Sequence, residues 1–228
     1  LPVAPACNLQ CNYCNRKFDC SNESRTGVSS SLLTPDQAVA NVRQVAMAIP
    51  QLSVVGIAGP GDPLANIGRS FRTLELIREQ LPDLKLCLST NGLMLPDAVD
   101  RLLDVGVDHV TVTINTLDPD IAAKIYAWLW LDGERYSGRE AGQILVARQL
   151  EGVRRLTEKG VLVKINSVLI PGINDHSLVD VSRTLRQYGA FIHNIMPLIA
   201  RPEHGTVFGL NGQPEPDGTM LAEIGRAH

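Results

Sequence analysis

The stretch Leu84-Lys85-Leu86-Cys87-Leu88-Ser89-Thr90-Asn91-Gly92 has the form of a buried strand followed by a polar turn. Its apolar residues make a short run, and Asn91 and Gly92 are residue types that commonly form turns. Helical periodicity precedes the run over Gly68–Leu81 and follows it over Pro96–Val105. A strand between two helices predicts one unit of an alternating α/β fold.

The same alternation of strands and helices extends toward both ends of the chain. A first strand is expected to end near Ala6, and five more are expected over Ser53–Ala58, Leu84–Ser89, His109–Asn115, Leu162–Leu169 and Phe191–Pro197. Helices are expected over Thr34–Ile49, Gly68–Leu81, Pro96–Val105, Asp118–Leu131, Arg139–Lys159 and Asp175–Tyr188. Strict alternation predicts a parallel sheet whose apolar strands are covered on both faces. Six units are too few for a closed eight-stranded barrel, so we predict an open, partial (β/α)6 TIM-type barrel.

Local signals agree with several of these boundaries. Thr34-Pro35-Asp36-Gln37 has the form of a helix N-cap with proline in the first turn. Gly106, Gly160 and Gly189 follow three of the helices, where a left-handed C-terminal cap is expected. Beyond Pro202 the chain is rich in Gly and Pro, so we expect a loop followed by a short helix.

The length of 228 residues fits one large domain or two small ones, and we predict a single domain over residues 1–228. Hydrophobic residues make up 44% of the chain, enough for a large buried core. The formal net charge is -3 with no long run of either sign, which argues against nucleic-acid binding. No apolar stretch reaches the ~20 residues of a membrane-spanning helix, and the start lacks the features of a signal peptide. We therefore expect a cytoplasmic protein and, because the first residue is not Met, a chain that begins inside a longer protein.

Four of the five cysteines fall within residues 7–20. This clustering is unlike a disulfide-stapled secreted domain and favours thiolate metal ligands in a reducing compartment. Cys7, Cys11 and Cys14 form a CxxxCxxC motif that places three thiols on one short loop. Three cysteines around four irons leave one iron open for a reactive ligand. The alternative is a structural zinc ion with Cys20 or a histidine as its fourth ligand, although such sites usually pair cysteines as CxxC.

The CxxxCxxC motif, with the aromatic Tyr13 before its last cysteine and a strand–helix series after it, resembles the radical SAM superfamily. The resemblance spans nearly the whole chain. It implies a [4Fe–4S] cluster on Cys7, Cys11 and Cys14 whose open iron binds the amino and carboxylate groups of S-adenosylmethionine. It also implies that one electron cleaves this cofactor to a 5′-deoxyadenosyl radical.

Further positions match places where this superfamily binds S-adenosylmethionine. The segment Gly56–Pro63 ends a predicted strand where the superfamily carries a Gly-Gly-Glu-type motif, with Asp62 at the acidic position. Glycines there let the backbone approach the methionine amino group, so Gly59 and above all Gly61 are candidate contacts. Asn91, Thr113 and Asn115 at or near later strand ends are further candidates, as are Ile165 within the strand Leu162–Leu169, against adenine, and Tyr13 of the cysteine motif. For Asn91 the alternative is a residue that only caps the turn.

Several longer segments resemble the branch of the superfamily that builds the core of the nitrogenase iron–molybdenum cofactor. They are Asn12–Cys20, Asn22–Val28, Ala58–Ala65, Ile125–Trp128 and Glu203–Gly212. The resemblance implies fusion of two additional [4Fe–4S] clusters, bound as substrates, with one extra sulfur atom into an [8Fe–9S–C] product. One S-adenosylmethionine would donate a methyl group, and a second would supply the radical that starts its conversion to carbide. The implied partners are an iron–sulfur cluster donor, an electron donor such as a ferredoxin, and maturation proteins that accept the product.

This narrower resemblance gives candidate roles to residues beyond the motif. Cys20 and Cys87 are candidate ligands of one substrate cluster, although a buried strand cysteine such as Cys87 usually acts as a small hydrophobic side chain. Glu23 is a candidate transient ligand or proton carrier and Arg25 a candidate counter-charge for sulfide, whereas the alternative for both is an exposed loop salt bridge. The branch also carries a His-Pro-Cys segment before the first strand and a CxxC segment near the end of the domain. Neither is present at those places, so ligands for two clusters rather than three are expected.

Three functions remain open from the sequence. The first is a radical SAM maturase that fuses clusters, and the second is a radical SAM enzyme that acts on a peptide or a small molecule. The third is a non-enzymatic carrier of iron–sulfur clusters. Cleavage of S-adenosylmethionine separates the first two from the third, and the amount of bound iron separates the first from the second.

Overall fold

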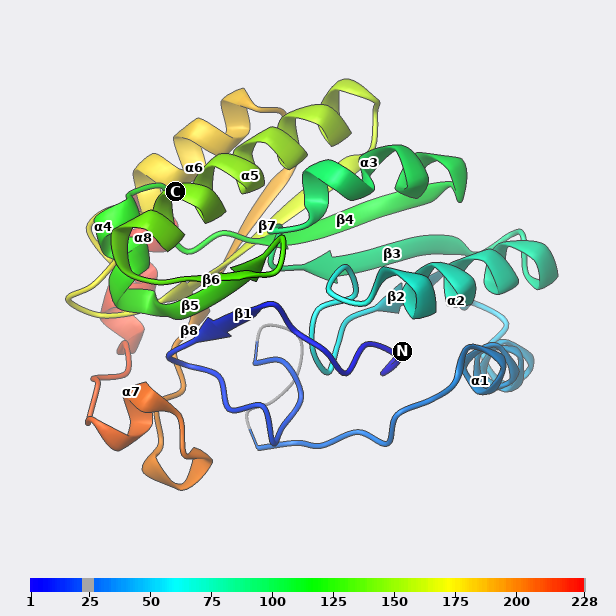
Figure 1. The fold of residues 1–228 in the computed structure, drawn as a ribbon, viewed down its shortest axis with the longest axis horizontal. Helices are drawn as coiled ribbons and strands as arrows, with labels where there is room; N and C mark the ends of the chain where they lie inside the picture. The colour runs from blue at the N-terminus through cyan, green and yellow to red at the C-terminus, as the bar shows by residue number, and fades with distance from the viewer. Residues whose placement is uncertain (22–26, 228) are drawn as a thin grey trace.

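The computed structural model describes residues 1–21 and 27–227 and contains alternating strands and helices (Figure 1). The parallel strands are β2 (Val54–Ile57), β3 (Lys85–Thr90), β4 (Val107–Thr113), β7 (Leu162–Leu169) and β8 (Ile192–Pro197). The antiparallel strands are β1 (Leu9–Cys11), β5 (Tyr126–Leu131) and β6 (Glu134–Tyr136). The longer helices are α1 (Pro35–Ala48), α2 (Ile67–Gln80), α3 (Leu95–Asp104), α5 (Gly138–Glu158), α6 (Leu178–Gln187) and α8 (Gly218–Ala227). The shorter helical segments are α4 (Pro119–Ile125), η1 (Pro202–His204) and α7 (Val207–Leu210).

The parallel strands form one sheet in the order β2-β3-β4-β7-β8, and every neighbouring pair in it is parallel. In Figure 1, helices α3, α5 and α6 lie above this sheet, and the N-terminal segment, drawn in dark blue, lies below it. Parallel strands joined by helices form the wall of a TIM-type barrel. The predicted fold class, α/β with a partial barrel of parallel strands, is confirmed.

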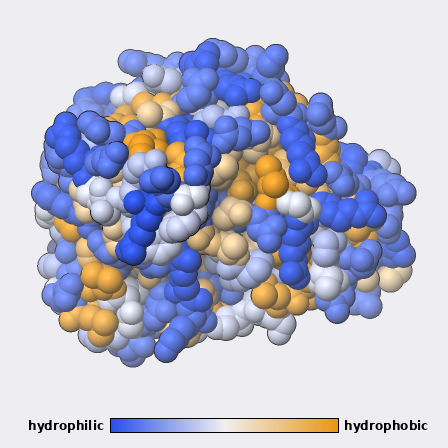
Figure 2. Space-filling model, in the orientation of Figure 1, coloured by the Kyte–Doolittle hydropathy of each residue, from blue (hydrophilic) through white to orange (hydrophobic). Residues whose placement is uncertain are grey.

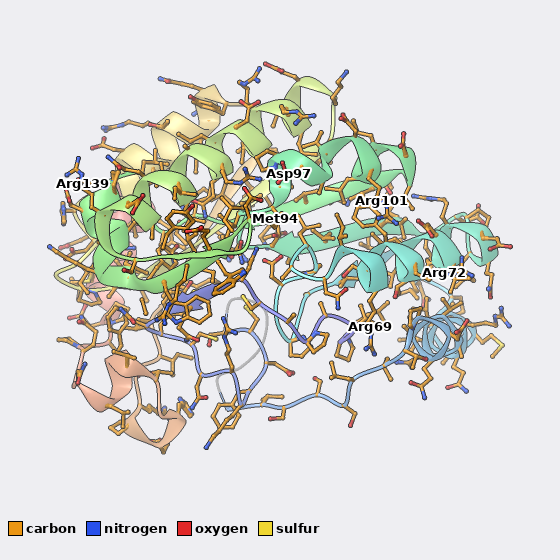
Figure 3. All side chains as sticks on the ribbon, in the orientation of Figure 1. Arg69, Arg72, Met94, Asp97, Arg101 and Arg139 are labelled. Carbon is orange, nitrogen blue, oxygen red and sulfur yellow. The ribbon has the colours of Figure 1, made fainter. Side chains whose placement is uncertain are left out.

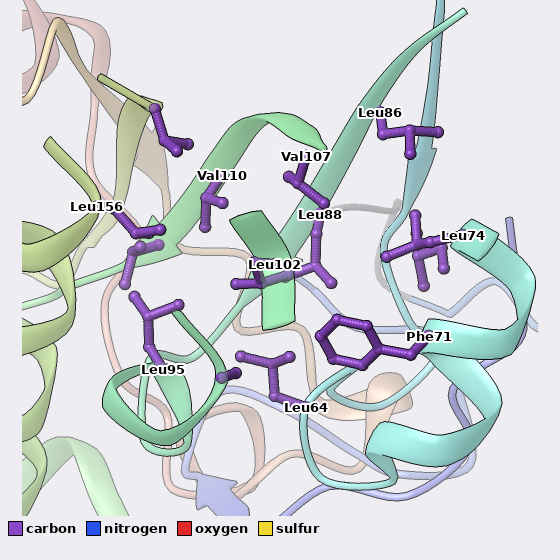
Figure 4. Packing of buried hydrophobic residues seen from close by; sticks show 14 of the residues in the cluster. Leu64, Phe71, Leu74, Leu86, Leu88, Leu95, Leu102, Val107, Val110 and Leu156 are labelled. Atoms are coloured by element: carbon purple, nitrogen blue, oxygen red, sulfur yellow. The ribbon is translucent and has the colours of Figure 1, made fainter. Parts of the chain in front are cut away.

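The main core fills the space between the sheet and its helices. Leu86 and Leu88 of β3 and Val110 of β4 meet Phe71 of α2 and Leu102 of α3 (Figure 4). All five side chains are fully buried. Burying a large apolar side chain contributes roughly 1.5–3 kcal/mol, so this layer holds the strands firmly in place.

Helix boundaries follow the local sequence signals. The Thr34 hydroxyl accepts a hydrogen bond from the Gln37 N–H, and the Gln37 side chain accepts one from the Thr34 N–H. Gly106, Gly160 and Gly189 have φ angles of 72°, 80° and 87°, in the region that favours glycine. The predicted N-cap and the three left-handed helix ends are confirmed.

The second half of one predicted helix is wrong. The helical pattern over Asp118–Leu131 ends as α4 at Ile125, and the chain continues as strand β5. β5 pairs antiparallel with both β1 and β6. Trp128 and Trp130 therefore lie on a strand, where aromatic side chains are favoured. Pairing with β1, which is distant in sequence, decides between the two conformations.

The predicted first barrel strand, ending near Ala6, is also wrong in extent. Among residues 1–21 and 27–227, this segment forms a single parallel bridge, between Ala4 and Pro60. Pro5 has no N–H to donate, which prevents a continuous ladder. The segment still lies beside the end of β2, because the Ala4 carbonyl accepts a hydrogen bond from the Gly61 N–H at 2.6 Å.

The outer surface of the helices is rich in charge. Arg101 of α3 reaches toward α2 (Figure 3), with its guanidinium 4.2 Å from the centre of the Phe71 ring and 3.3 Å from a Glu75 carboxylate oxygen. Figure 2 shows a mostly hydrophilic face with small, separate apolar patches. Among the described residues, no helix has the length and apolar character needed to cross a membrane.

Candidate active site

A cavity of about 240 Å³ lies where the N-terminal segment passes the carboxyl ends of β2, β3 and β4. The strand ends contribute the lining residues Asp62, Ser89, Thr90, Asn91 and Thr113. The N-terminal segment contributes Cys7, Cys11, Cys14, Arg16 and Cys20. Active sites of βα barrels form at this end of the sheet, because the loops that follow the strands converge there.

The three motif cysteines share this cavity. Cys7, Cys11 and Cys14 are free thiols, with Cys11 buried and the other two partly exposed. Burial raises the pKa of each thiol, to about 12 for Cys7, and for Cys11 the two neighbouring thiols raise the pKa further. Thiols that ionise with difficulty alone are stabilised as thiolates by bound iron, since metals bind the deprotonated form. The donor set therefore fits a [4Fe–4S] cluster.

The described part of the chain contains no group of three or more Cys, His, Asp or Glu side chains close enough to hold a single metal ion. A zinc ion would bring its thiolates to about 4 Å from one another, because Zn–S bonds are about 2.3 Å long. The three motif thiols line one cavity, and three thiolates are the ligand number expected for a [4Fe–4S] cluster with one open iron.

Asp62 is a buried carboxylate that joins the loops after β2 and β3. It accepts hydrogen bonds from the Asn91 N–H at 2.6 Å and from the Thr90 hydroxyl at 3.0 Å. The Asn91 side chain donates to Asn8 Oδ1 at 2.9 Å, and its Nδ2 lies 3.8 Å from Cys7 Sγ. Burial raises the pKa of Asp62, and the hydrogen bonds oppose this effect. Asp62 thus supports the predicted site residue Asn91 beside the first cysteine.

Gly59 and Gly61 bring the loop after β2 against the N-terminal segment. Gly59 has a φ of 106°, and a methyl group at Gly61 would overlap the Ala6 carbonyl oxygen. The Gly61 N–H already donates to the Ala4 carbonyl. Gly61 lines the cavity and Gly59 does not. Contact of either glycine with S-adenosylmethionine stays a prediction.

Of the remaining predicted cofactor contacts, Thr113 lines the cavity, whereas Tyr13, Asn115 and Ile165 do not. The Asn115 side chain is fully buried, and its Nδ2 donates to the hydroxyls of Tyr13 and Tyr126 at 2.9 and 3.0 Å. Ile165 belongs to the core between the sheet and the helices. These three residues are buried and do not line the cavity, and their contact with S-adenosylmethionine stays a prediction.

The residues predicted to serve the substrate cluster do not all lie at the cavity. Cys20 lines the cavity with the motif cysteines, whereas Cys87 does not. Cys87 packs against Gly56, where an added methyl group would lie 3.8 Å from the cysteine sulfur. Glu23 and Arg25 lie outside the described residues. The roles predicted for these four side chains stay predictions.

Sequence reasoning missed Arg16 and Asp19, which also line the cavity. The buried Asp19 carboxylate accepts hydrogen bonds from the N–H and hydroxyl of Ser30 at 3.0 and 2.5 Å. The Arg16 guanidinium donates to the Leu9 carbonyl at 2.9 Å and lies 4.7 Å from the centre of the Trp128 ring. The sequence signals for both residues are their place just after the last motif cysteine and within the segment Asn12–Cys20.

The chain matches the family model of the Radical SAM superfamily over residues 1–185. It is 88% identical over 222 residues to the FeMo cofactor biosynthesis protein NifB of Klebsiella pneumoniae. It is 55% identical over 222 residues to the protein of the same name from Azotobacter vinelandii. The two alignments cover 97% of this chain but 47% and 44% of the relatives, so the chain spans about half the length of the curated relatives it matches.

Solved structures share the fold at low sequence identity. Streptococcus suis SuiB bound to S-adenosylmethionine has a TM-score of 0.67 and 14% identity, over 99% of this chain and 44% of that chain. The protein anSMEcpe with bound AdoMet has a TM-score of 0.60 and 16% identity, over 93% of this chain and 60% of that chain. At these identities the likeness concerns the arrangement of strands and helices alone.

Proposed function

Because the chain belongs to the radical SAM superfamily, we propose that it is the S-adenosylmethionine-cleaving domain of a protein that makes the precursor of the nitrogenase iron–molybdenum cofactor. The observation that carries the proposal is the convergence of Cys7, Cys11 and Cys14 on one cavity at the carboxyl ends of the strands. High identity to proteins named FeMo cofactor biosynthesis protein NifB supports the choice of product.

In this proposal the three cysteines bind a [4Fe–4S] cluster as thiolates and leave one iron open to S-adenosylmethionine. When bound, the cluster supplies the electron that cleaves S-adenosylmethionine to a radical. Asn91 orients its amide toward the sulfur of Cys7, and Asp62 holds the turn that carries Asn91. Apolar lining residues such as Leu9, Phe18 and Leu32 limit the water around a reactive radical.

The substrates in this proposal are two [4Fe–4S] clusters, which are fused with a carbon from S-adenosylmethionine and one further sulfur atom from a separate sulfur source into an [8Fe–9S–C] product. Methyl transfer precedes hydrogen abstraction by the radical. Cys20 and Cys87 hold one substrate cluster, Glu23 acts as a transient ligand or proton carrier, and Arg25 balances the charge of sulfide. The place of Cys20 on the cavity wall supports the first of these roles.

The proposed reaction needs three kinds of partner in the cytoplasm. An iron–sulfur cluster donor supplies the substrate clusters, and a ferredoxin-like protein supplies electrons. Maturation proteins accept the finished precursor. The names of the relatives support a role in cofactor assembly.

Anaerobic reconstitution with iron and sulfide, followed by dithionite and S-adenosylmethionine, tests the proposal. We expect 5′-deoxyadenosine from the wild-type chain and none from Cys14→Ala. Cys20→Ala and Cys87→Ala should contain less iron and still cleave S-adenosylmethionine. Cluster-loaded wild-type protein that forms no 5′-deoxyadenosine would favour a non-enzymatic carrier. Cleavage with only about four irons per chain, the content of one cluster, would favour a conventional substrate.

A further inference from the structure

The cavity wall contains cations and carboxylates that differ in how they are bound. Arg16 and Lys17 provide two positive charges, and Asp19 and Asp62 provide two carboxylates. Both carboxylates are buried and accept hydrogen bonds from neighbouring protein groups. These hydrogen bonds stabilise the two carboxylates and leave their negative charges in place, so Arg16 and Lys17 are the groups of this wall that favour added negative charge in the cavity.

Arg16 is held in one place by two kinds of contact. Its Nη2 donates a hydrogen bond to the Leu9 carbonyl at 2.9 Å. Its guanidinium also lies 4.7 Å from the centre of the Trp128 ring, and the guanidinium of Arg135 lies 5.2 Å from the same ring centre. A guanidinium can stack on an aromatic ring and keep its full charge. A long side chain on a loop is thus fixed by a residue of strand β5.

The contact with Leu9 also places Arg16 next to a motif cysteine. The Leu9 carbonyl accepts a hydrogen bond from Cys7 Sγ at 3.3 Å as well as from Arg16 Nη2 at 2.9 Å. Since both atoms contact the same oxygen, they are separated by no more than about 6 Å, a range in which a charge strongly biases the charge state of its neighbour. Arg135 contacts the same tryptophan but is not among the residues that line the cavity.

We propose that Arg16, clamped by Trp128, supplies a fixed positive charge that stabilises the reduced form of the cluster bound by Cys7, Cys11 and Cys14. The inference rests on the proposed function, because it requires that cluster. One-electron reduction by dithionite adds one negative charge to the cluster and its thiolates, and a nearby cation favours that state. Arg16 is exposed to solvent, which screens its charge.

The expected effect is a change in the reduced fraction of the cluster at a fixed potential. Removing the charge should lower the ratio of reduced to oxidised cluster by roughly threefold to tenfold. A tenfold change corresponds to 59 mV for one electron. Removing the aromatic clamp should have a smaller effect in the same direction, because the cation remains but is no longer fixed.

A redox titration of the reconstituted chain, without S-adenosylmethionine and followed by electron paramagnetic resonance of the reduced cluster, tests the inference. We expect a lower reduction potential for Arg16→Gln, a smaller decrease for Trp128→Ala, and partial rescue by Arg16→Lys. The matched control is Arg135→Gln, which removes a charge from the same ring away from the cavity and should leave the potential unchanged. Iron content and the unfolding midpoint are measured for every variant.

An unchanged potential in an iron-loaded Arg16→Gln variant would overturn the inference. Equal shifts in Arg16→Gln and Arg135→Gln would also overturn it, because they would indicate a general effect of surface charge. Weaker binding of S-adenosylmethionine at an unchanged potential would assign Arg16 to the cofactor and likewise overturn it. If Arg16→Gln does not retain iron, Trp128→Ala provides the same comparison with every cluster-facing group in place. A wild-type chain that binds no reducible cluster contradicts the proposed function itself, so the two failures are distinguishable.

Discussion

Replacing Asp62 with alanine tests the buried contacts that hold the turn after β3 beside the cysteines. The carboxylate accepts hydrogen bonds from the N–H groups of Leu64 at 2.9 Å and Asn91 at 2.6 Å, and from the Thr90 hydroxyl at 3.0 Å. A buried N–H left without an acceptor costs about 1–3 kcal/mol, whereas the hydroxyl can rotate toward another acceptor. The variant also ceases to bury a charge, which offsets part of the loss. We expect the free energy of unfolding to fall by about 3 kcal/mol.

Urea unfolding of the metal-free, reduced chain at neutral pH, followed by far-ultraviolet circular dichroism, measures this loss. The matched control is Asp97→Ala, because Asp97 on α3 is half exposed and pairs with Arg148 at the surface (Figure 3). An exposed ion pair contributes about 0–1 kcal/mol, so the control should remain close to the wild type. A loss below about 1 kcal/mol for Asp62→Ala, or a loss equal to that of the control, would refute the reasoning.

The pH dependence gives a second test of the same carboxylate. Burial raises the pKa of Asp62 above its usual 3.8 in the folded chain, so the folded state binds this proton more tightly than the unfolded state does. The corresponding stability is present below pH 3.8 and is lost as the pH rises through the folded pKa. Asp62→Asn cannot titrate, so the difference in unfolding free energy, wild type minus variant, should decrease over that window. A difference that stays constant with pH would contradict the expected pKa shift.

Three further changes test other parts of the structure. Gly61→Ala should cost roughly 1–3 kcal/mol of unfolding free energy because its methyl group would overlap the Ala6 carbonyl. The control is Gly68→Ala, whose added methyl group lies in open space on a helix, so this variant should be neutral or more stable by up to about 1 kcal/mol. Equal urea midpoints for Gly61→Ala and Gly68→Ala would contradict the expected difference. Thr34→Ala should cost about 1 kcal/mol by removing the capping box of α1, and an unchanged urea midpoint would argue against that cap. Burial raises the pKa of Cys7 from 9.0 to about 12 in the metal-free folded chain. The folded state therefore holds the thiol proton more tightly than the unfolded state, and the stability that this contributes is present below pH 9 and is lost as the pH rises toward 12. At pH 8 Cys7 should therefore react with iodoacetamide about a thousandfold more slowly than in urea, and similar rates by mass spectrometry would refute the shift.

Strands and helices could be predicted where the residues of the segment itself determine its conformation. The predicted strand Leu84–Ser89 differs from β3 by one residue at each end, because its apolar run and polar turn are local signals. The pattern over Asp118–Leu131 allowed two conformations. The strand conformation of its second half depends on pairing with β1, and no local pattern contains that information.

The site was predictable to the extent that its chemistry lies in one short motif. Cys7, Cys11 and Cys14 needed only to be on one loop to share a cavity. Asn115 follows β4 and Ile165 lies within β7, but the side of the sheet toward which each side chain points depends on the register of the strand and on packing. Arg16 could not be predicted, because its place depends on the Trp128 ring and therefore on the strand that the sequence pattern missed.

The shape of the cysteine loop depends on contacts with the far end of the chain. The Phe208 N–H donates a hydrogen bond to the Asn12 carbonyl at 3.0 Å, and the Asn15 side chain donates to the His204 carbonyl at 2.9 Å. Both partners belong to Glu203–Gly212, a segment that sequence similarity singles out without giving a physical reason. The structure supplies one, since these contacts hold the loop on either side of its last motif cysteine. The motif thus determines which atoms can bind iron, whereas distant backbone contacts determine where those atoms lie, as preorganised metal sites require.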